Sequence, residues 1–343
     1  MSKLYRLFGF FFLVVALPVC IAVNTAVGAE MPKALTIGTS SVGSTFYTMA
    51  VGISDILTRS TGININAEAV GGSDANARAI RDGKVEMAVL NSFAARNALL
   101  GKGTFVKGGP APLRLVFQGH TSLRQLLARR QADIQSFPDL KGKVLIGKRK
   151  SLAELYLITK ALLNAYGMKE TDLKIVETSA TSGAIQALEV GSVAAAIFPG
   201  GIFDPNVTEL LQRKVAVLVP ISDEKFSEAL KQLGPAFGKF TIPTTMYANM
   251  TEPINAFRMK ALLVAGADVP DEVVYRVGKA MIEHQGEIER VHKAGAEWNL
   301  ENTISDIPLP FHPGMIKALK ETGNWNPTLQ AQQDALMAEV PSN

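Results

Sequence analysis

Short runs of apolar and β-branched residues alternate with stretches of helical periodicity along the chain from Leu35 onward. The short runs predict strands at residues 35–38, 63–69, 85–90, 113–119, 144–147, 174–177, 194–198 and 215–219. The clearest helix is predicted over residues 152–166, where apolar side chains recur every three or four positions. Alternating strands and helices are typical of an α/β fold in which helices cover a mostly parallel sheet.

The alternation forms two blocks, which we interpret as two lobes. Residues 131–143, QADIQSFPDLKGK, separate the blocks and predict a loop that leads into a short helical turn. Strand-like sequence returns at residues 241–266, and helices are predicted over residues 270–284 and 313–322. Because these elements follow the second block, we expect the chain to cross back to the first lobe, with a hinge at the crossings.

The expected domain boundaries follow from this pattern. Lobe 1 covers residues 30–130, lobe 2 covers residues 131–240, and a C-terminal segment over residues 241–325 returns in part to lobe 1. Residues 326–343 form a polar tail, which we expect to fray.

The N-terminus has the layout of a secretory signal peptide. Residues 1–6 are basic, an apolar stretch follows, and the small residues 27–29 form a cleavage site. We therefore expect residues 1–29 to be removed and the mature protein to be periplasmic. The alternative is an uncleaved anchor, because residues 7–29 carry no charge and are long enough to span a bilayer. Cys20, the one cysteine, lies in this segment, so the mature chain has no disulfide and no thiol nucleophile.

Composition and charge exclude several classes of protein. Apolar residues make up 47% of the chain and charged residues 19%, which is typical of a globular protein and not of a disordered one. The formal net charge is only +4, and Lys3 and Arg6 of the predicted signal peptide supply part of it. No run of aromatic residues and arginines accompanies it, so we expect no nucleic-acid partner.

Candidate binding residues cluster where predicted strands end. Residues 37–47, IGTSSVGSTFY, pass from a strand through Gly, Ser and Thr into a helix, a pattern that favours a carboxylate or similar group at the helix N-terminus. Residues 70–76, VGGSDAN, and the pair Asn91-Ser92 follow the next two strands. In open α/β sheets ligands bind at the carboxyl ends of strands, so these corners are expected to meet at one site. Taken singly, the first corner is equally well explained as a turn capped by Ser44 or Thr45.

Two corners of the second block stand in equivalent places. Residues 147–151, GKRKS, place three cations after a strand, where an arginine can hold an acidic ligand through two hydrogen bonds. Residues 199–205, PGGIFDP, end another strand and can set backbone amides and a Phe ring against a ligand. The alternatives are a solvated basic loop and a rigid turn, respectively.

Nothing in the sequence supports catalysis. The histidines at positions 120, 284, 292 and 312 are dispersed and lack the spacing of metal ligands. The Gly-x-Ser-x-Gly pattern of hydrolases is absent. We therefore predict a protein that is not an enzyme, with no catalytic residues, no metal and no cofactor.

The order of these segments resembles the TAXI family, the solute receptors of TRAP transporters. The segments are IGTSSVGSTFY, VGGSDAN, VEMAVLNS, FPDLKGKVLIG, IFPGGIFDPNVTELL, DVPDEVVYRVGKAM and PFHPGMIKALKETG, and they extend over nearly the whole mature chain. The resemblance implies a two-lobed type II periplasmic-binding-protein fold with a hinge and an interlobe ligand cleft. It implies capture of a small anionic solute, a carboxylate or an amino acid such as glutamate, and delivery to TRAP membrane permease subunits. We expect the receptor to be monomeric.

The resemblance also assigns ligand-binding positions. They are Thr39, Ser40, Gly43, Ser44, Thr45 and Tyr47 in the first corner, Gly72 and Ser73 in the second, Asn91 and Ser92 in the third, Lys148, Arg149, Lys150 and Ser151 in the fourth, and Gly200, Gly201 and Phe203 in the fifth.

Two departures from the family pattern bear on the ligand. The first corner is usually rich in glycine, whereas this chain has Ser40, Ser41, Val42 and Ser44. The fourth corner usually contains small residues, whereas this chain has KRKS. Together the two departures indicate a smaller or more acidic ligand than glutamate, and the alternative is the loss of transport ligands. A ligand-sensing protein that presents its bound state to a membrane sensor kinase has the same sequence features and stays as the alternative function.

Overall fold

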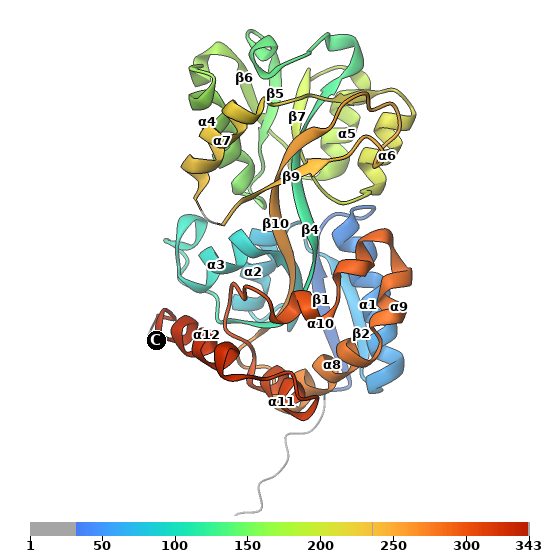
Figure 1. The fold of residues 1–343 in the computed structure, drawn as a ribbon, viewed down its shortest axis with the longest axis vertical. Helices are drawn as coiled ribbons and strands as arrows, with labels where there is room; N and C mark the ends of the chain where they lie inside the picture. The colour runs from blue at the N-terminus through green and yellow to red at the C-terminus, as the bar shows by residue number, and fades with distance from the viewer. Residues whose placement is uncertain (1–31, 235, 342–343) are drawn as a thin grey trace, which may run out of the picture. The chain divides into compact units, whose positions relative to one another are not determined.

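The computed structural model describes residues 32–234 and 236–341 (Figure 1). The predicted signal peptide, with Cys20, lies outside the described residues. None of the helices in the described part of the chain has both the length and the apolar character needed to cross a membrane.

The strands follow the predicted runs closely. They are β1 (Ala34–Thr39), β2 (Asn64–Ala69), β3 (Met87–Asn91), β4 (Leu113–Arg129), β5 (Val144–Lys148), β6 (Lys174–Glu177), β7 (Ala195–Gly201), β8 (Ala216–Leu218), β9 (Gly238–Ile242) and β10 (Ile254–Gly266).

Helices fill most of the intervals between the strands. They are α1 (Thr45–Thr61), α2 (Ser73–Arg81), α3 (Ser92–Leu99), α4 (Glu154–Ala165), α5 (Thr181–Val190), α6 (Pro205–Gln212), α7 (Asp223–Leu233), α8 (Asp271–Glu283), α9 (Gln285–Val291), α10 (Leu300–Ile304), α11 (Pro313–Glu321) and α12 (Pro327–Ala338). Helix α1 shows why these boundaries arise: Ser44 caps its first turn, and Gly62 ends it in the left-handed conformation. The α/β class is confirmed.

The sheet is mixed, so the prediction of a mostly parallel sheet was wrong. Its strand order is β2-β1-β3-β10-β4-β7-β5-β6, with β8 added to β4 and β9 to β10. The outer strands pair in parallel, β1 with β2 and β3, and β5 with β6 and β7. The central strands β4 and β10 run antiparallel to each other and to their other neighbours. The sequence pattern ended β4 at Gly119, whereas the strand continues through the polar residues that follow as far as Arg129.

Apolar side chains gather in separate cores at the two ends of this sheet. The core we call the first lobe is built on β1, β2 and β3, and includes the apolar residues between Leu113 and Phe117 of β4 and Ala261–Ala265 of β10. The second lobe is built on β5 and β7, and includes Leu126 of β4 and Phe257 of β10. Strands β4 and β10 therefore belong to both lobes, and Figure 1 shows them running side by side from one to the other.

The two long strands lose their regular register where they pass between the lobes. Lys260 pairs with Thr121 and Leu262 with Gln118, so Gly119 and His120 bulge out of the ladder. A Cβ at Gly119 would lie 2.0 Å from the Trp298 ring, so only glycine fits there. The Trp298 indole is fully buried and donates a hydrogen bond to His120 Nδ1 at 3.0 Å.

The polar tail is helical, contrary to the expectation that it frays. Asn326 caps α12, Pro327 occupies its first position, and the Leu329 side chain is buried against the first lobe. The side-chain amide of Gln333 accepts a hydrogen bond from the Phe311 backbone N–H and donates one to the Phe311 carbonyl. These contacts hold α12 against the first lobe.

Candidate functional site

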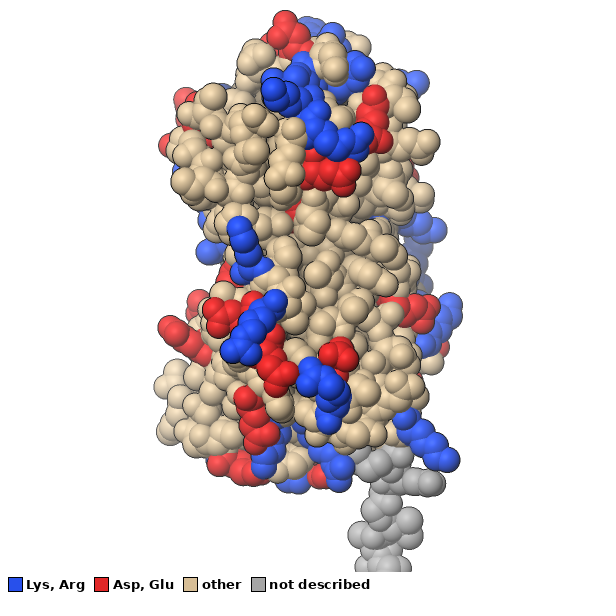
Figure 2. Space-filling view, turned by 90° about the vertical axis from the view of Figure 1, so that its right-hand side faces the viewer, with Lys and Arg blue, Asp and Glu red and all other residues tan. Residues whose placement is uncertain are grey.

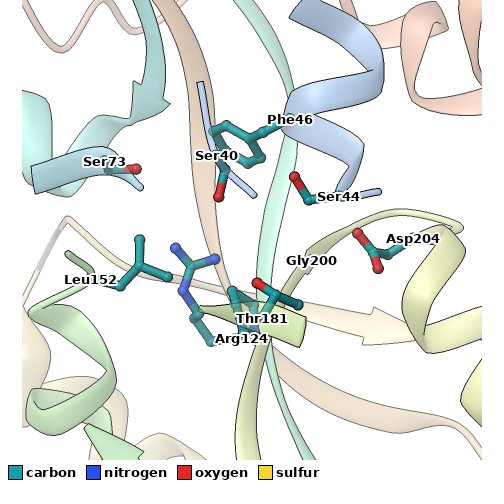
Figure 3. Close-up of a pocket in the computed structure, with 10 residues that line it drawn as sticks. Ser40, Ser44, Phe46, Ser73, Arg124, Leu152, Thr181, Gly200 and Asp204 are labelled. Atoms are coloured by element: carbon teal, nitrogen blue, oxygen red, sulfur yellow. The ribbon is translucent and has the colours of Figure 1, made fainter. Parts of the chain in front are cut away.

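A small cavity lies between the lobes, at the carboxyl ends of the parallel strands (Figure 3). It is lined by Ser40, Ser44, Phe46 and Ser73 of the first lobe, Arg124 of β4, and Leu152, Thr181, Pro199, Gly200 and Asp204 of the second. The space open to the centre of a water molecule is about 20 Å³, which accommodates one ordered water and no organic solute. The structure therefore shows the lobes closed on each other.

The N-terminus of α1 is occupied by a carboxylate of the second lobe. Asp204 caps α6 through the amides of Asn206 and Val207, and its other oxygen accepts hydrogen bonds from the Thr45 amide at 3.2 Å and the Thr45 hydroxyl at 2.8 Å. The side-chain amide of Asn206 donates a hydrogen bond to the Gly43 carbonyl at 3.0 Å. Burial raises the pKa of Asp204, and these four donors oppose that shift. The helix N-terminus that the sequence assigns to a ligand anion thus holds the protein's own anion.

Arg149 reaches from the second lobe into the first. Its side chain donates to the hydroxyls of Ser151 and Thr181 within its own lobe, both at 2.9 Å. Across the cleft it donates to the Ser41 hydroxyl at 3.0 Å and to the Gly71 carbonyl. Arg149 is only 3% exposed, and burial lowers its pKa to about 10, so it stays charged at neutral pH. Its hydrogen-bond partners among the described residues are all neutral oxygens.

Arg124 has the opposite environment, because a buried carboxylate pairs with it. Its Nε and Nη2 atoms donate to Glu154 Oε1, and the Asn91 amide of the first lobe donates to the same oxygen at 3.0 Å. Both charged side chains are at most 2% exposed. Arg124 therefore lines the cavity with its charge already compensated.

A second carboxyl group adjoins this pair from the other lobe. Asp74 of α2 accepts a hydrogen bond from the Ala153 amide at 3.0 Å, and its own amide donates to the Ser151 carbonyl. Burial, and then the neighbouring charge of Glu154, raise the pKa of Asp74 to about 7. Closure of the lobes thus brings two acidic side chains together in a dry environment.

Two glycines allow the lobes to approach this closely. A Cβ at Gly201 would lie 2.8 Å from the Thr45 side chain of the opposite lobe. A Cβ at Gly72, whose φ is +155°, would lie 3.0 Å from the Ser151 carbonyl oxygen. Larger side chains at either position would hold the lobes apart.

The structure brings together many, though not all, of the positions assigned from the sequence. Ser40, Ser44, Ser73 and Gly200 line the cavity, while Gly43, Thr45, Gly72, Asn91, Arg149, Ser151 and Gly201 make contacts across or around it. Thr39 is buried at the end of β1, and the backbone amide of Tyr47 donates to Ser44.

The remaining assigned positions lie away from the cavity. The Lys148 ammonium sits 4.2 Å from the centre of the Tyr156 ring, and Lys150 is exposed. The Phe203 ring faces Lys293 at 4.3 Å. The Ser92 hydroxyl accepts from the Lys260 amide beside a separate surface groove.

The sequence pattern did not single out the lining residues Arg124 and Asp204, nor Glu154, which pairs with Arg124. Arg124 lies beyond the predicted end of its strand, so no corner motif contained it. Asp204 carried a readable signal, since Asp before Pro is a helix start. Glu154 lies in the first turn of α4, where an acidic residue is expected for electrostatic reasons alone.

The described residues contain no group of three or more His, Cys, Asp and Glu side chains that could hold a metal ion. Burial lowers the pKa of His120 to about 3, so this ring is neutral and serves as the acceptor for Trp298. His312 caps α11. On the face shown in Figure 2, lysines and arginines are interspersed with acidic residues and leave no extended basic surface.

Solved structures of similar fold are solute-binding proteins. MatC from Rhodopseudomonas palustris, with bound malate, matches with a TM-score of 0.54 and 15% identity, over 91% of this chain and 100% of that one. The alkanesulfonate-binding protein SsuA from Xanthomonas axonopodis pv. citri, bound to MOPS, matches with a TM-score of 0.51 and 15% identity, over 91% and 86%. A structure described as a periplasmic transporter gives 0.52 and 15%, over 89% and 95%. At this level of identity the similarity shows the fold.

The family is given by the sequence itself. A family model described as the NMT1-like family matches residues 37–323, which is most of the chain. The chain therefore belongs to the NMT1-like family and has the two-lobed α/β fold of periplasmic solute-binding proteins.

Proposed function

We propose that this protein is a periplasmic receptor that captures a small anionic solute, a carboxylate or an amino acid, between its two lobes. We further propose that it belongs to the TAXI group and delivers the solute, as a monomer, to the permease of a TRAP-type transport system. The order of its sequence segments, its family and its fold support this proposal.

The environment of Arg149 is the observation that supports an anionic solute. This guanidinium is 3% exposed, and among the described residues it hydrogen-bonds only to neutral oxygens and forms no ion pair. Burial of such a charge is costly unless an opposite charge accompanies it. A carboxylate that enters the cleft supplies that charge and accepts two parallel hydrogen bonds from the guanidinium.

Capture follows from the placement of polar groups on both lobes. When the lobes separate, the Arg149 contacts to Ser41 and Gly71 break and the guanidinium becomes available. A bound carboxylate replaces these oxygens, and the hydroxyls of Ser40, Ser73 and Thr181 lie around the same cavity to bond the rest of the solute (Figure 3). Because contacts come from both lobes, the solute binds the closed state more tightly and shifts the population toward it.

The test is calorimetric titration of the mature protein with a panel of small carboxylates and amino acids. Wild type is expected to bind at least one member, and Arg149→Gln is expected to weaken that binding by about tenfold to a hundredfold, because it removes a charged hydrogen-bond donor.

Lys150→Gln is the matched control, since it removes the same charge from the adjacent, exposed position. Its affinity is expected to equal that of wild type. Equal losses in both variants would show that only the general field of the basic loop matters. A folded wild-type protein that binds no member of the panel would contradict the proposed function.

A further inference from the structure

The charges around the cavity limit the kind of anion that the cleft can hold. Among the described residues that line the cavity or hydrogen-bond to a lining residue, the cations are Arg124 and Arg149. The carboxyl groups at the same place are Glu154, Asp204 and, beside them, Asp74. Each of these groups has a definite partner, and the partners decide how much positive charge is left for a solute.

Two positive groups of the site, the Arg124 guanidinium and the N-terminus of α1, already bind carboxyl groups of the protein. Glu154 Oε1 accepts from two nitrogens of Arg124, so this guanidinium offers no net charge. Asp204 fills the N-terminus of α1 with hydrogen bonds to both the amide and the hydroxyl of Thr45. A ligand carboxylate at either place would have to compete with a carboxyl group of the protein that already accepts the hydrogen bonds of these donors.

Arg149 is the cation of this set that lacks a carboxylate partner. The two lysines that flank it do not reach the cavity, since Lys148 stacks on Tyr156 and Lys150 is exposed. The run of three cations in the sequence therefore supplies one charge to the cleft.

We infer that the cleft selects solutes with a single carboxylate and discriminates against dicarboxylates. This inference rests on the proposed function and narrows its class of ligand. A first carboxylate pairs with Arg149. A second carboxylate would meet Glu154 and Asp204, and Glu154 Oε2, which is buried without a hydrogen-bond partner among the described residues, suits a donor group of the solute instead.

The experiment uses pairs of ligands that differ only in the second acid group. The pairs are succinate with succinamate, glutarate with glutaramate, and glutamate with glutamine, each titrated into the wild-type mature protein. In every pair that binds, the monoamide is expected to bind about tenfold tighter or more, because its amide can donate to the protein carboxylates. Dicarboxylates that bind as tightly as their monoamides, or tighter, would overturn the inference while leaving the proposed function standing.

The variant Glu154→Gln tests the cause of the selectivity. It keeps the shape of the side chain, removes the internal carboxylate and frees the charge of Arg124, so the preference for the monoamide is expected to shrink by about tenfold. Glu170→Gln is the matched control, because Glu170 is an exposed glutamate of the same lobe bonded to Tyr156. It is expected to keep the wild-type preference.

An unchanged preference in a folded Glu154→Gln protein would overturn the assigned cause. If that variant does not fold, the comparison of the ligand pairs on wild type decides the inference alone. Absence of binding for all six ligands to folded wild type would overturn this inference, and the proposed function fails as well only if no other member of the panel binds.

Discussion

The basic corner after β5 shows what can be predicted for single residues. The sequence places Lys148, Arg149 and Lys150 at the end of a strand, where ligands bind in this class of fold. It does not tell which of them turns inward, because that depends on the backbone path after Lys148 and on partners from distant segments, Ser41, Gly71 and Thr181. Such long-range hydrogen bonds are properties of the folded lobes and leave no local pattern.

Asp74 gives a residue-level prediction about pH. Its pKa rises from 3.8 to about 7 in the folded protein, so the folded state binds a proton more tightly than the unfolded state. Stability from this group is therefore full below the unfolded pKa and is lost as pH rises from about 4 to about 7. Relative to Asp74→Asn, wild type is expected to lose roughly 1–4 kcal/mol of unfolding free energy over that range.

Urea unfolding of both proteins at pH 5 and pH 8 measures this difference. Comparison with the variant cancels the titration of groups distant from Asp74, so the difference reports Asp74 together with the adjacent Glu154. Parallel dependence of stability on pH in wild type and Asp74→Asn would show that the carboxyl group is not desolvated as the structure has it.

At the scale of elements, strand ends and helix starts were predictable and the central strands were not. Most strand boundaries fall within a few residues of the apolar runs, because each run is the buried part of a strand. Strands β4 and β10 differ, since they pass between two cores and carry buried polar residues such as Gln118, His120 and Arg124. Buried polar side chains mimic the pattern of a loop, so the sequence pattern placed the end of β4 too early.

The approach of the two lobes depends on Gly201 of β7. Gly201→Ala would place a methyl group 2.8 Å from Thr45 and 3.0 Å from His120, so closure is expected to be disfavoured. Ligand affinity is expected to fall by about tenfold because the methyl group lies on the contact surface of the lobes and hinders their closure. The charge of the site stays the same.

Gly286→Ala is the matched control, because a Cβ at that position meets no atom within 4 Å. Calorimetry on both variants checks the prediction. Normal affinity in Gly201→Ala would mean that the liganded state does not require the contact between β7 and α1.

A substitution at Gly119 tests the packing of the bulge in β4. Gly119→Ala would drive a methyl group into the Trp298 ring, which is fully buried. We expect a loss of unfolding free energy of about 1–3 kcal/mol, as for other overpacked sites, together with a change in the fluorescence of Trp298. Unchanged stability and an unchanged spectrum would contradict the tight packing of this bulge.

On the scale of the whole molecule, the sequence predicted a two-lobed α/β protein with a site at the strand ends. In the described chain, β4 and β10 join one apolar core in the first lobe to two in the second, and several residues of the predicted corners lie around the cavity between the lobes. The charge balance of that site could not be predicted from the sequence. Asp204 occupies the N-terminus of α1 only because the lobes close. Glu154 pairs with Arg124 inside the second lobe, but the two residues come from segments 30 positions apart, so no local pattern shows the pair.

Because the solute contacts both lobes, its binding is expected to stabilise them together. At a concentration of one hundred times the dissociation constant, the unfolding free energy should rise by about 2.7 kcal/mol. Thermal unfolding of wild type should then shift upward as one transition, and Arg149→Gln should gain only about 0.4–1.4 kcal/mol at the same concentration, because its affinity is tenfold to a hundredfold lower. A shift confined to part of the transition would indicate a ligand held by one lobe alone.

The central claim is that a small carboxylate binds between the lobes with its charge on Arg149. A crystal structure of the mature protein with the tightest-binding carboxylate of the panel tests it most directly. We predict electron density in the cavity lined by Ser40, Ser73 and Thr181, with the ligand carboxylate at hydrogen-bond distance from the Arg149 guanidinium. Ligand density outside this cleft, or a carboxylate bound within it and out of reach of Arg149, would contradict the account.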